Sequence, residues 1–215
     1  MTEVCVKICG LGTEATLDAA LEAGAELVGF VHFPKSPRHV TLERGRDLAR
    51  RARGRAERVV LLVDPDDTLL AAVIDALDPD VIQLHGKESP QRVASIRGRT
   101  GRPVMKAIGI AAAGDLVALP GYTAVADRLL LDAKPPPGAD LPGGNGRSFD
   151  WDILRGALLP AGTMLSGGLD AENVGTALAR TGLAAVDVSS GVEIRPGEKD
   201  PAKIAAFVAA TRRRA

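Results

Sequence analysis

The chain has little cysteine and few aromatic residues, and each shortage excludes a class of protein. The only cysteines are Cys5 and Cys9. If both lie in one strand, their Cα atoms are about 13 Å apart, whereas a disulfide tolerates roughly 7 Å at most. Two free thiols and an N-terminal segment unlike an export signal predict a cytoplasmic protein. Aromatic residues make up 3% of the chain, which leaves few rings for stacking on nucleic-acid bases.

The chain also lacks net charge and long apolar runs. Its 27 Lys and Arg residues balance 27 Asp and Glu residues, so it has no basic surface for nucleic acid or an anionic membrane. No run approaches the roughly 20 apolar residues that cross a bilayer. We therefore expect neither nucleic-acid nor membrane binding, and any bound anion must be held by a local site.

Short apolar runs alternate with stretches of helical spacing along the whole chain. Most of the runs are unbroken, as in parallel strands covered on both faces. The predicted strands are Val4–Ile8, Leu27–Val31, Val59–Val63, Val81–Leu84, Val104–Ile108, Leu129–Leu131, Thr163–Leu165 and Ala185–Val188. The predicted helices are Glu14–Ala23, Leu42–Arg53, Thr68–Leu77, Gln91–Arg97, Glu172–Arg180 and Pro201–Thr211, with weaker patterns at Ala111–Leu119 and Asp150–Ala157.

Eight strand–helix units fit into 215 residues, and each has about the length that a parallel strand with its crossover helix needs. The sequence thus predicts an α/β fold, a single (β/α)8 TIM barrel domain over residues 1–215, with an open sheet as the alternative. Two segments interrupt the alternation, residues 32–38 and the Pro- and Gly-rich residues 133–148. Both follow strands, and in a barrel that end carries the active site.

Two turns after the last predicted strands are typical of phosphate binding. Ser-Gly-Gly-Leu occupies 166–169 and Ser-Ser-Gly occupies 189–191. Glycine lets backbone N–H groups approach an anion closely, and barrels of this kind often bind phosphate after strands seven and eight. Ordinary loop glycines are the alternative. The expected phosphate-binding residues are Gly167, Gly168, Ser189, Ser190 and Gly191.

Cys9 and Asp132 are the candidate catalytic residues. Cys9 ends the first strand and has the same parity as Cys5 and Lys7, so all three side chains are expected inside the barrel, with Cys9 at its mouth. A buried, unreactive cysteine is the alternative. Asp132 ends an apolar strand, where an unpaired carboxylate is costly, so it is either functional or paired with Lys134 or Arg128.

Three further residues are candidates for substrate contacts. Arg38 lies in a proline-stiffened loop, where its guanidinium suits a substrate carboxylate held through two hydrogen bonds. A solvated loop arginine is the alternative. His85 follows the fourth predicted strand and Asp187 lies in the eighth. Each is interpreted as a substrate contact, although a structural role is the common fate of such a residue.

Seven motifs occur in order and together carry a family resemblance. The chain closely resembles the phosphoribosylanthranilate isomerases of tryptophan biosynthesis over nearly its whole length. The motifs are Val-Lys-Ile-Cys-Gly-Leu at 6–11, Gly-Phe-Val-His-Phe-Pro-Lys-Ser-Pro-Arg at 29–38, Gln-Leu-His-Gly at 83–86, Leu-Leu-Asp at 130–132, Gly-Gly-Asn-Gly-Arg-Ser-Phe-Asp-Trp at 143–151, Ser-Gly-Gly-Leu at 166–169 and Val-Asp-Val-Ser-Ser-Gly-Val-Glu at 186–193.

The resemblance implies an Amadori rearrangement of N-(5-phosphoribosyl)anthranilate to 1-(2-carboxyphenylamino)-1-deoxyribulose 5-phosphate, with no metal or other cofactor. It makes Cys9 the general base, Asp132 the general acid and Arg38 the partner of the anthranilate carboxylate. For that role Asp132 must hold a proton near neutrality, so a raised pKa is expected. The expected partner is a phosphorylated small molecule, and the chain is expected to be a monomer or a homodimer.

Three other functions remain open from the sequence. A metal-dependent pentulose-phosphate epimerase could use His32, His85, Asp132 and Asp187 as ligands. A lysine Schiff-base aldolase could use Lys106 or Lys134. A sugar-phosphate sensor would bind the same ligand without turnover.

Overall fold

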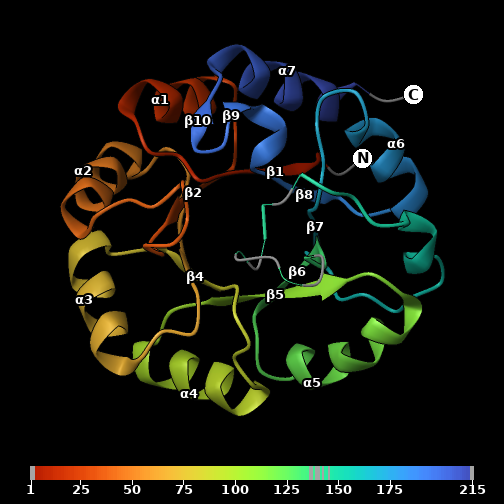
Figure 1. Ribbon diagram of the computed structural model, residues 1–215, viewed down its shortest axis with the longest axis horizontal. Helices are drawn as coiled ribbons and strands as arrows, with labels where there is room; N and C mark the ends of the chain where they lie inside the picture. The colour runs from red at the N-terminus through yellow and green to blue at the C-terminus, as the bar shows by residue number, and fades with distance from the viewer. Residues whose placement is uncertain (1–2, 136–137, 139–140, 142, 145, 214–215) are drawn as a thin grey trace.

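Eight parallel strands close into a barrel in sequence order, with β1 paired to both β2 and β8. This computed structural model describes residues 3–135, 138, 141, 143–144 and 146–213. Figure 1 looks down the barrel and shows the helices as a ring around the strands. The closed ring confirms the predicted TIM barrel and excludes the open sheet. The strands are β1 Cys5–Cys9, β2 Leu27–Val31, β3 Glu57–Leu62, β4 Val81–Leu84, β5 Val104–Ile110, β6 Arg128–Ala133, β7 Met164–Leu165 and β8 Ala185–Val188.

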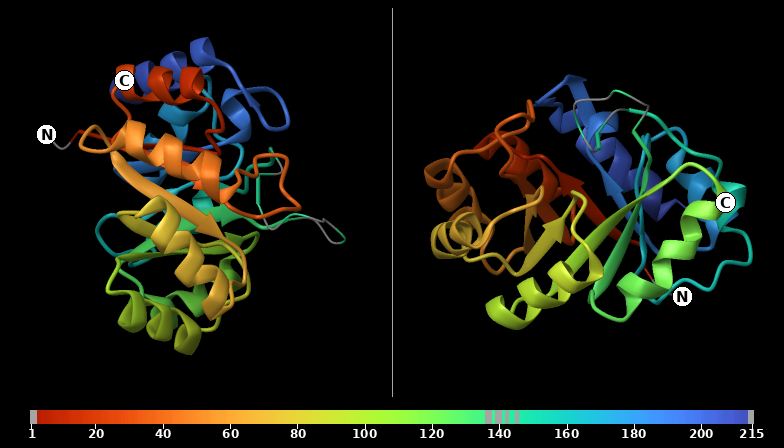
Figure 2. Two further views of the ribbon diagram at one scale, coloured as in Figure 1. Left: turned by 90° about the vertical axis from the view of Figure 1, so that its left-hand side faces the viewer. Right: turned by 60° about the horizontal axis from the view of Figure 1, so that its bottom comes forward.

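The helices that cover the barrel begin at side chains suited to cap them. Thr13, Thr41, Asp66 and Ser89 each accept a hydrogen bond from a backbone N–H in the first helical turn. Figure 2 shows from two other sides that the helices lie outside the strands. The α-helices are α1 Glu14–Glu22, α2 Leu42–Ala52, α3 Asp67–Leu77, α4 Pro90–Thr100, α5 Leu119–Thr123, α6 Val174–Thr181 and α7 Pro201–Arg212.

The side chains of β1 alternate as the parity argument predicts. Val6 and Ile8 are fully buried in the outer core between strands and helices. Cys5 instead packs against the inner core, which fills the lower barrel. Lys7 and Cys9 follow Cys5 on that inner side. The inner core consists of Leu27, Val59, Val81, Met105, Ala107, Leu130, Met164 and Ala185.

Three details differ from the sequence expectations. The weak helical pattern Ala111–Leu119 forms the 3-10 helix η1 Ala113–Ala118 followed by α5, and the pattern Asp150–Ala157 forms only η2 Trp151–Leu154. Both patterns are short and contain a glycine, Gly114 or Gly156, and a helix of this length is marginal on its own. After β8 the chain forms η3 Ser190–Val192 and then a hairpin, β9 Glu193–Arg195 with β10 Glu198–Lys199, which was not predicted. Of the predicted loop 133–148, residues 136–137, 139–140, 142 and 145 lie outside the described residues.

Candidate active site

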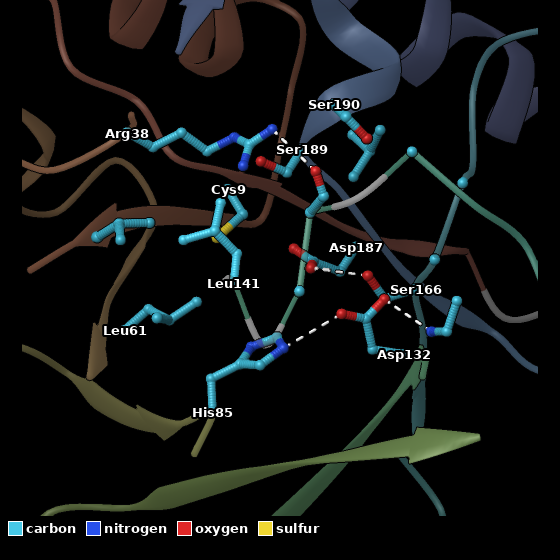
Figure 3. A pocket seen from close by; sticks show the side chains of 18 of the residues that line it. Cys9, Arg38, Leu61, His85, Asp132, Leu141, Ser166, Asp187, Ser189 and Ser190 are labelled. Carbon is cyan, nitrogen blue, oxygen red and sulfur yellow. Dashed lines mark hydrogen bonds and ion pairs between the residues drawn. The ribbon is translucent and has the colours of Figure 1, made fainter. Parts of the chain in front are cut away.

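One pocket opens at the carboxyl ends of the barrel strands and gathers every predicted site residue except Gly191. Figure 3 shows side chains from β1, β4, β6, β7 and β8 directed toward it. Because the strands are parallel, residues far apart in the sequence reach the same end of the barrel. The predicted residues that line the pocket are Cys9, Arg38, His85, Asp132, Gly167, Gly168, Asp187, Ser189 and Ser190.

Cys9 ends β1 at the mouth of the barrel, with 3% of its surface exposed. Gly29 on β2 leaves room for it, because a Cβ atom there would lie 3.0 Å from Cys9 Sγ and 3.3 Å from Lys7 Cε. Burial raises the pKa of the Cys9 thiol, and the ammonium group of Lys7 opposes that rise. The pKa of the thiol therefore stays above its ordinary value, and the Lys7 ammonium reduces the cost of forming the thiolate that burial imposes.

Lys7 and Asp187 form an ion pair under the floor of the pocket. Lys7 Nζ donates to Asp187 Oδ1 over 2.8 Å, and the Lys7 side chain is fully buried. Ser166 Oγ donates to Asp187 Oδ2 over 3.2 Å. Burial lowers the pKa of Lys7, but Asp187 and Cys9 together raise it more, so the pKa stays above its ordinary value. Asp187 lines the pocket, but both of its carboxylate oxygens already accept a hydrogen bond from the protein, one from Lys7 and one from Ser166.

Asp132 ends β6 and faces His85 at the end of β4. His85 Nε2 lies 3.1 Å from Asp132 Oδ2, and Ala133 N–H donates to Asp132 Oδ1 over 2.9 Å. The His85 side chain is 11% exposed and the Asp132 side chain 7% exposed. Asp132 is thus paired with His85. Neither of the two basic partners considered from the sequence pairs with Asp132, because Lys134 pairs with Asp115 and Arg128 pairs with Glu57.

Arg38 is held by Glu193 rather than free for a two-point grip through its Nε edge. Its Nε donates to Glu193 Oε1 over 2.7 Å, and its Nη2 donates to Glu193 Oε2 over 2.8 Å and to the Gly144 carbonyl over 3.2 Å. Figure 3 shows the guanidinium at the pocket rim. Among the described residues none accepts a hydrogen bond from Nη1, which therefore faces the pocket as a donor for a ligand. A protein carboxylate thus occupies the Nε edge of the guanidinium, and the predicted contact with a substrate carboxylate stays a prediction for the Nη1 side.

Glu193 and Lys199 belong to the site, although sequence reasoning missed them. Lys199 Nζ donates to Glu193 Oε1 over 2.7 Å and to the Ser189 carbonyl over 2.8 Å. Burial lowers the pKa of Lys199, although Glu193 opposes the change. Burial alone would raise the pKa of Glu193, but Arg38 and Lys199 hold it below its usual range. The Val-Glu pair after the Ser-Ser-Gly turn was the sequence signal for Glu193. Its partner Arg38 could not be assigned, because the two residues are 155 positions apart in the sequence.

The two predicted phosphate turns lie side by side at one end of the pocket. Gly167 and Gly168 adopt φ values of +89° and +62°, which favour glycine. A Cβ on Gly191 would overlap the Leu169 carbonyl oxygen, so Gly191 is needed where the two turns touch. The helix predicted from Glu172 begins instead at Val174. Only η3 starts directly at the pocket, after Ser189.

Of the residues considered for the other chemistries, Lys106 and His32 lie away from the pocket, whereas Lys134 lines it but has a carboxylate partner. Lys106 points outside the barrel to Glu88 Oε2 at 2.7 Å, and Lys134 pairs with Asp115. His32 does not line the pocket, and its Nδ1 contacts the Val40 carbonyl at 2.9 Å. Among the described residues no three His, Cys, Asp or Glu side chains are grouped to hold a metal ion. No described helix is long and apolar enough to cross a membrane.

Comparison with known proteins points to a single family. Residues 6–210 match the family described as N-(5'phosphoribosyl)anthranilate (PRA) isomerase. The chain is 64% identical to the N-(5'-phosphoribosyl)anthranilate isomerase of Azorhizobium caulinodans, covering 96% of this chain and 91% of that protein. It is 56% identical to that of Bradyrhizobium diazoefficiens, covering 96% and 93%.

Solved structures agree with the sequence comparison. The phosphoribosyl anthranilate isomerase of Thermotoga maritima superposes with a TM-score of 0.86 at 33% identity, covering 97% of this chain and 98% of that one. A phosphoribosyl anthranilate isomerase in complex with reduced 1-(o-carboxyphenylamino)-1-deoxyribulose 5-phosphate gives a TM-score of 0.84 at 31% identity, covering 97% and 98%.

Proposed function

The chain belongs to the N-(5'-phosphoribosyl)anthranilate isomerase family and is an isomerase, and on that premise we propose how its pocket performs the reaction. The substrate is N-(5'-phosphoribosyl)anthranilate, a phosphorylated sugar joined to an aromatic carboxylate. Cys9 is the general base and Asp132 the general acid. The observation that carries the proposal is that both side chains line one pocket between Arg38 and the paired turns at 167–168 and 189–191.

The two ends of the pocket suit the two anionic ends of the substrate. Backbone N–H groups of Gly167, Gly168 and the Ser189–Ser190 turn would hold the phosphate, aided by the N-terminal end of η3. The Nη1 group of Arg38, which has no hydrogen-bond partner among the described residues, would donate to the anthranilate carboxylate at the other end. This places the ribose between β1 and β6.

Asp132 would protonate the furanose ring oxygen, which opens the ring and leaves a Schiff base. Its Oδ1 already accepts the Ala133 N–H, so Oδ2 is the oxygen that carries the transferred proton. Cys9, three strands away around the barrel, would then take the C2' proton as a thiolate, and the enolamine would become the ketone. Each general acid or base typically contributes about 10²–10⁴ to the rate.

The competing functions lose support from the same geometry. The four residues considered for an epimerase metal site do not form one group, because His32 lies away from the pocket. We further propose that the protein is cytoplasmic and acts as a monomer or a homodimer. Both oligomeric states are described for the relative from Thermotoga maritima, a dimeric enzyme from which monomers were generated.

A fluorescence assay on N-(5'-phosphoribosyl)anthranilate tests the assignment. Wild-type protein should turn over the substrate, whereas Cys9→Ser and Asp132→Asn should each lose about 10²-fold or more in kcat. The loss follows because serine is a far weaker acid than cysteine and asparagine has no proton to give. Cys5→Ser, at the opposite end of β1, is the matched control and should keep its activity. Inactive wild-type protein would refute the proposed function.

A further inference from the structure

Gln83 lies inside the barrel beneath His85, and its amide has one partnered atom and one unpartnered atom. The two residues are two apart on β4 and so face the same side. Gln83 Nε2 lies 3.0 Å from His85 Nδ1, and the residue is fully buried. Within the described part of the chain, Gln83 Oε1 is buried with no hydrogen-bond partner. An unpaired buried amide oxygen is costly, so this orientation must serve the group it faces.

The observed orientation of the Gln83 amide fits an ionised Asp132 carboxylate. An amide nitrogen only donates, so His85 Nδ1 must accept and therefore carries no proton. The neutral imidazole then has its proton on Nε2, which lies 3.1 Å from Asp132 Oδ2. That N–H donates to a carboxylate oxygen. Gln83, His85 and an ionised Asp132 thus form one consistent chain of hydrogen bonds.

The general-acid role requires one more proton on the Asp132–His85 pair. The pair then holds two protons, and one of them lies between Oδ2 and Nε2, since Asp132 Oδ1 already accepts the Ala133 N–H. Whichever of these two atoms holds that proton, the second proton is on Nδ1 of the imidazole, and Nδ1–H needs an acceptor. Rotation of the Gln83 amide about its Cγ–Cδ bond exchanges nitrogen for oxygen without changing its shape, and it brings Oε1 to face Nδ1.

We propose that Gln83 is a positioning residue whose amide orientation follows the proton load of the Asp132–His85 pair. The nitrogen faces the ring when Asp132 is ionised, and the oxygen faces it when the pair is ready to donate. In the step itself the Asp132 Oδ2–H bond breaks and an O–H bond forms on the ring oxygen, which leaves one proton on the imidazole. The inference rests on the proposed function.

Within the described ranges, Gln83 is the polar group found on the Nδ1 side of His85. The neighbouring strands present apolar side chains to the barrel interior here, Leu61 from β3 and Ala107 from β5. The ionisable residues that line the pocket with His85 are Cys9, Arg38, Asp132, Lys134, Arg147 and Asp187. Of these, Asp132 is the one within hydrogen-bonding distance of the ring, through Nε2.

Nitrogen-15 NMR of labelled histidine tests the proposal directly, because it shows which imidazole nitrogen carries the proton and the chain has three histidines to assign. His85→Gln identifies the His85 signals. In the wild type above its titration, His85 should carry its proton on Nε2. In Gln83→Glu the carboxylate should hold a proton on Nδ1 and move the His85 titration about one pH unit or more upward. Gln83→Met, which offers neither donor nor acceptor, should give a mixture of the two tautomers.

Controls separate this idea from general damage and from the proposed function. Gln91→Glu makes the same charge change at an exposed position on α4 and should leave His85 unchanged. Gln83→Met should lower kcat about tenfold with little change in KM, less than the loss from removing the acid itself. The inference would be overturned if His85 kept the wild-type tautomer in Gln83→Met, or in a folded Gln83→Glu variant. Wild-type protein inactive on phosphoribosylanthranilate would instead refute the function and leave the tautomer result standing.

Discussion

At the residue scale, the site depends on charges buried beneath the pocket as well as on groups exposed to it. Lys7 is fully enclosed and has Asp187 Oδ1 at 2.8 Å. Its ammonium opposes the effect of burial on Cys9. Parity on β1 predicted that Lys7 points inward, but the sequence could not supply its partner, since Asp187 is 180 positions away.

Replacing Lys7 by methionine should therefore weaken both the fold and the base. Asp187 would lose its counter-ion, and breaking a buried pair costs about 3–5 kcal/mol in the free energy of unfolding, which urea denaturation measures. Loss of the cation should also raise the pKa of the thiol, so the rise of kcat/KM with pH should move to higher pH. Lys87→Met, at an exposed position, is the control. An unchanged pH profile in Lys7→Met would contradict this role.

At the scale of elements, the β9–β10 hairpin connects the two anion-binding ends of the pocket. Its Glu193 holds Arg38, and its Lys199 reaches the Ser189 carbonyl in the phosphate turn. Short strands such as Glu193–Arg195 and Glu198–Lys199 lack the apolar run that reveals a barrel strand. The eight longer units could be predicted because each buries an apolar face.

Glu193→Gln should impair substrate binding more than turnover. The neutral amide would keep one hydrogen bond from Arg38 and present N–H groups to the other, so Arg38 would lose its fixed position. We expect KM to rise about tenfold, the equivalent of one charged hydrogen bond, with a smaller fall in kcat. Glu198→Gln, on the same hairpin and paired with exposed Arg195, should leave KM unchanged. A fall in kcat alone would contradict the anchoring role.

The connection after β5 is tied to β6 by Asp115, which gives a stability that depends on pH. Asp115 accepts hydrogen bonds from Lys134 Nζ and from the backbone N–H groups of Ala111 and Ala112, which lower its pKa from 3.8 to about 2. Because the folded pKa lies below the unfolded value, the stabilisation is present above pH 4 and disappears as the pH falls toward 2.

Asp115→Asn should consequently destabilise the protein by about 1 kcal/mol at pH 7, after allowance for solvent screening. The difference in free energy of unfolding from wild type should shrink to near zero at pH 2. Chemical denaturation at several pH values measures it. A difference that stays constant over this range would show that the ion pair does not contribute.

At the scale of the whole molecule, barrel closure turns scattered motifs into one site. The ring order could be predicted from repeated units, and the strand ends at Cys9, His85 and Asp132 from their position after apolar runs. The pairings Lys7–Asp187, His85–Asp132 and Arg38–Glu193 could not, because they depend on three-dimensional distances between distant segments. Sequence reasoning thus located the groups, and the fold determined which of them work together.

A crystal structure of this protein with reduced 1-(o-carboxyphenylamino)-1-deoxyribulose 5-phosphate tests the central claim most directly. We predict that the phosphate lies against the backbone of Gly167, Gly168 and the Ser189–Ser190 turn and that the carboxylate faces Arg38. Cys9 Sγ and Asp132 Oδ2 should then flank the sugar carbons from opposite sides, each about 3–3.5 Å from the atom it serves. A bound ligand that leaves either group out of reach of the sugar, or whose phosphate lies at Arg38, would contradict the account.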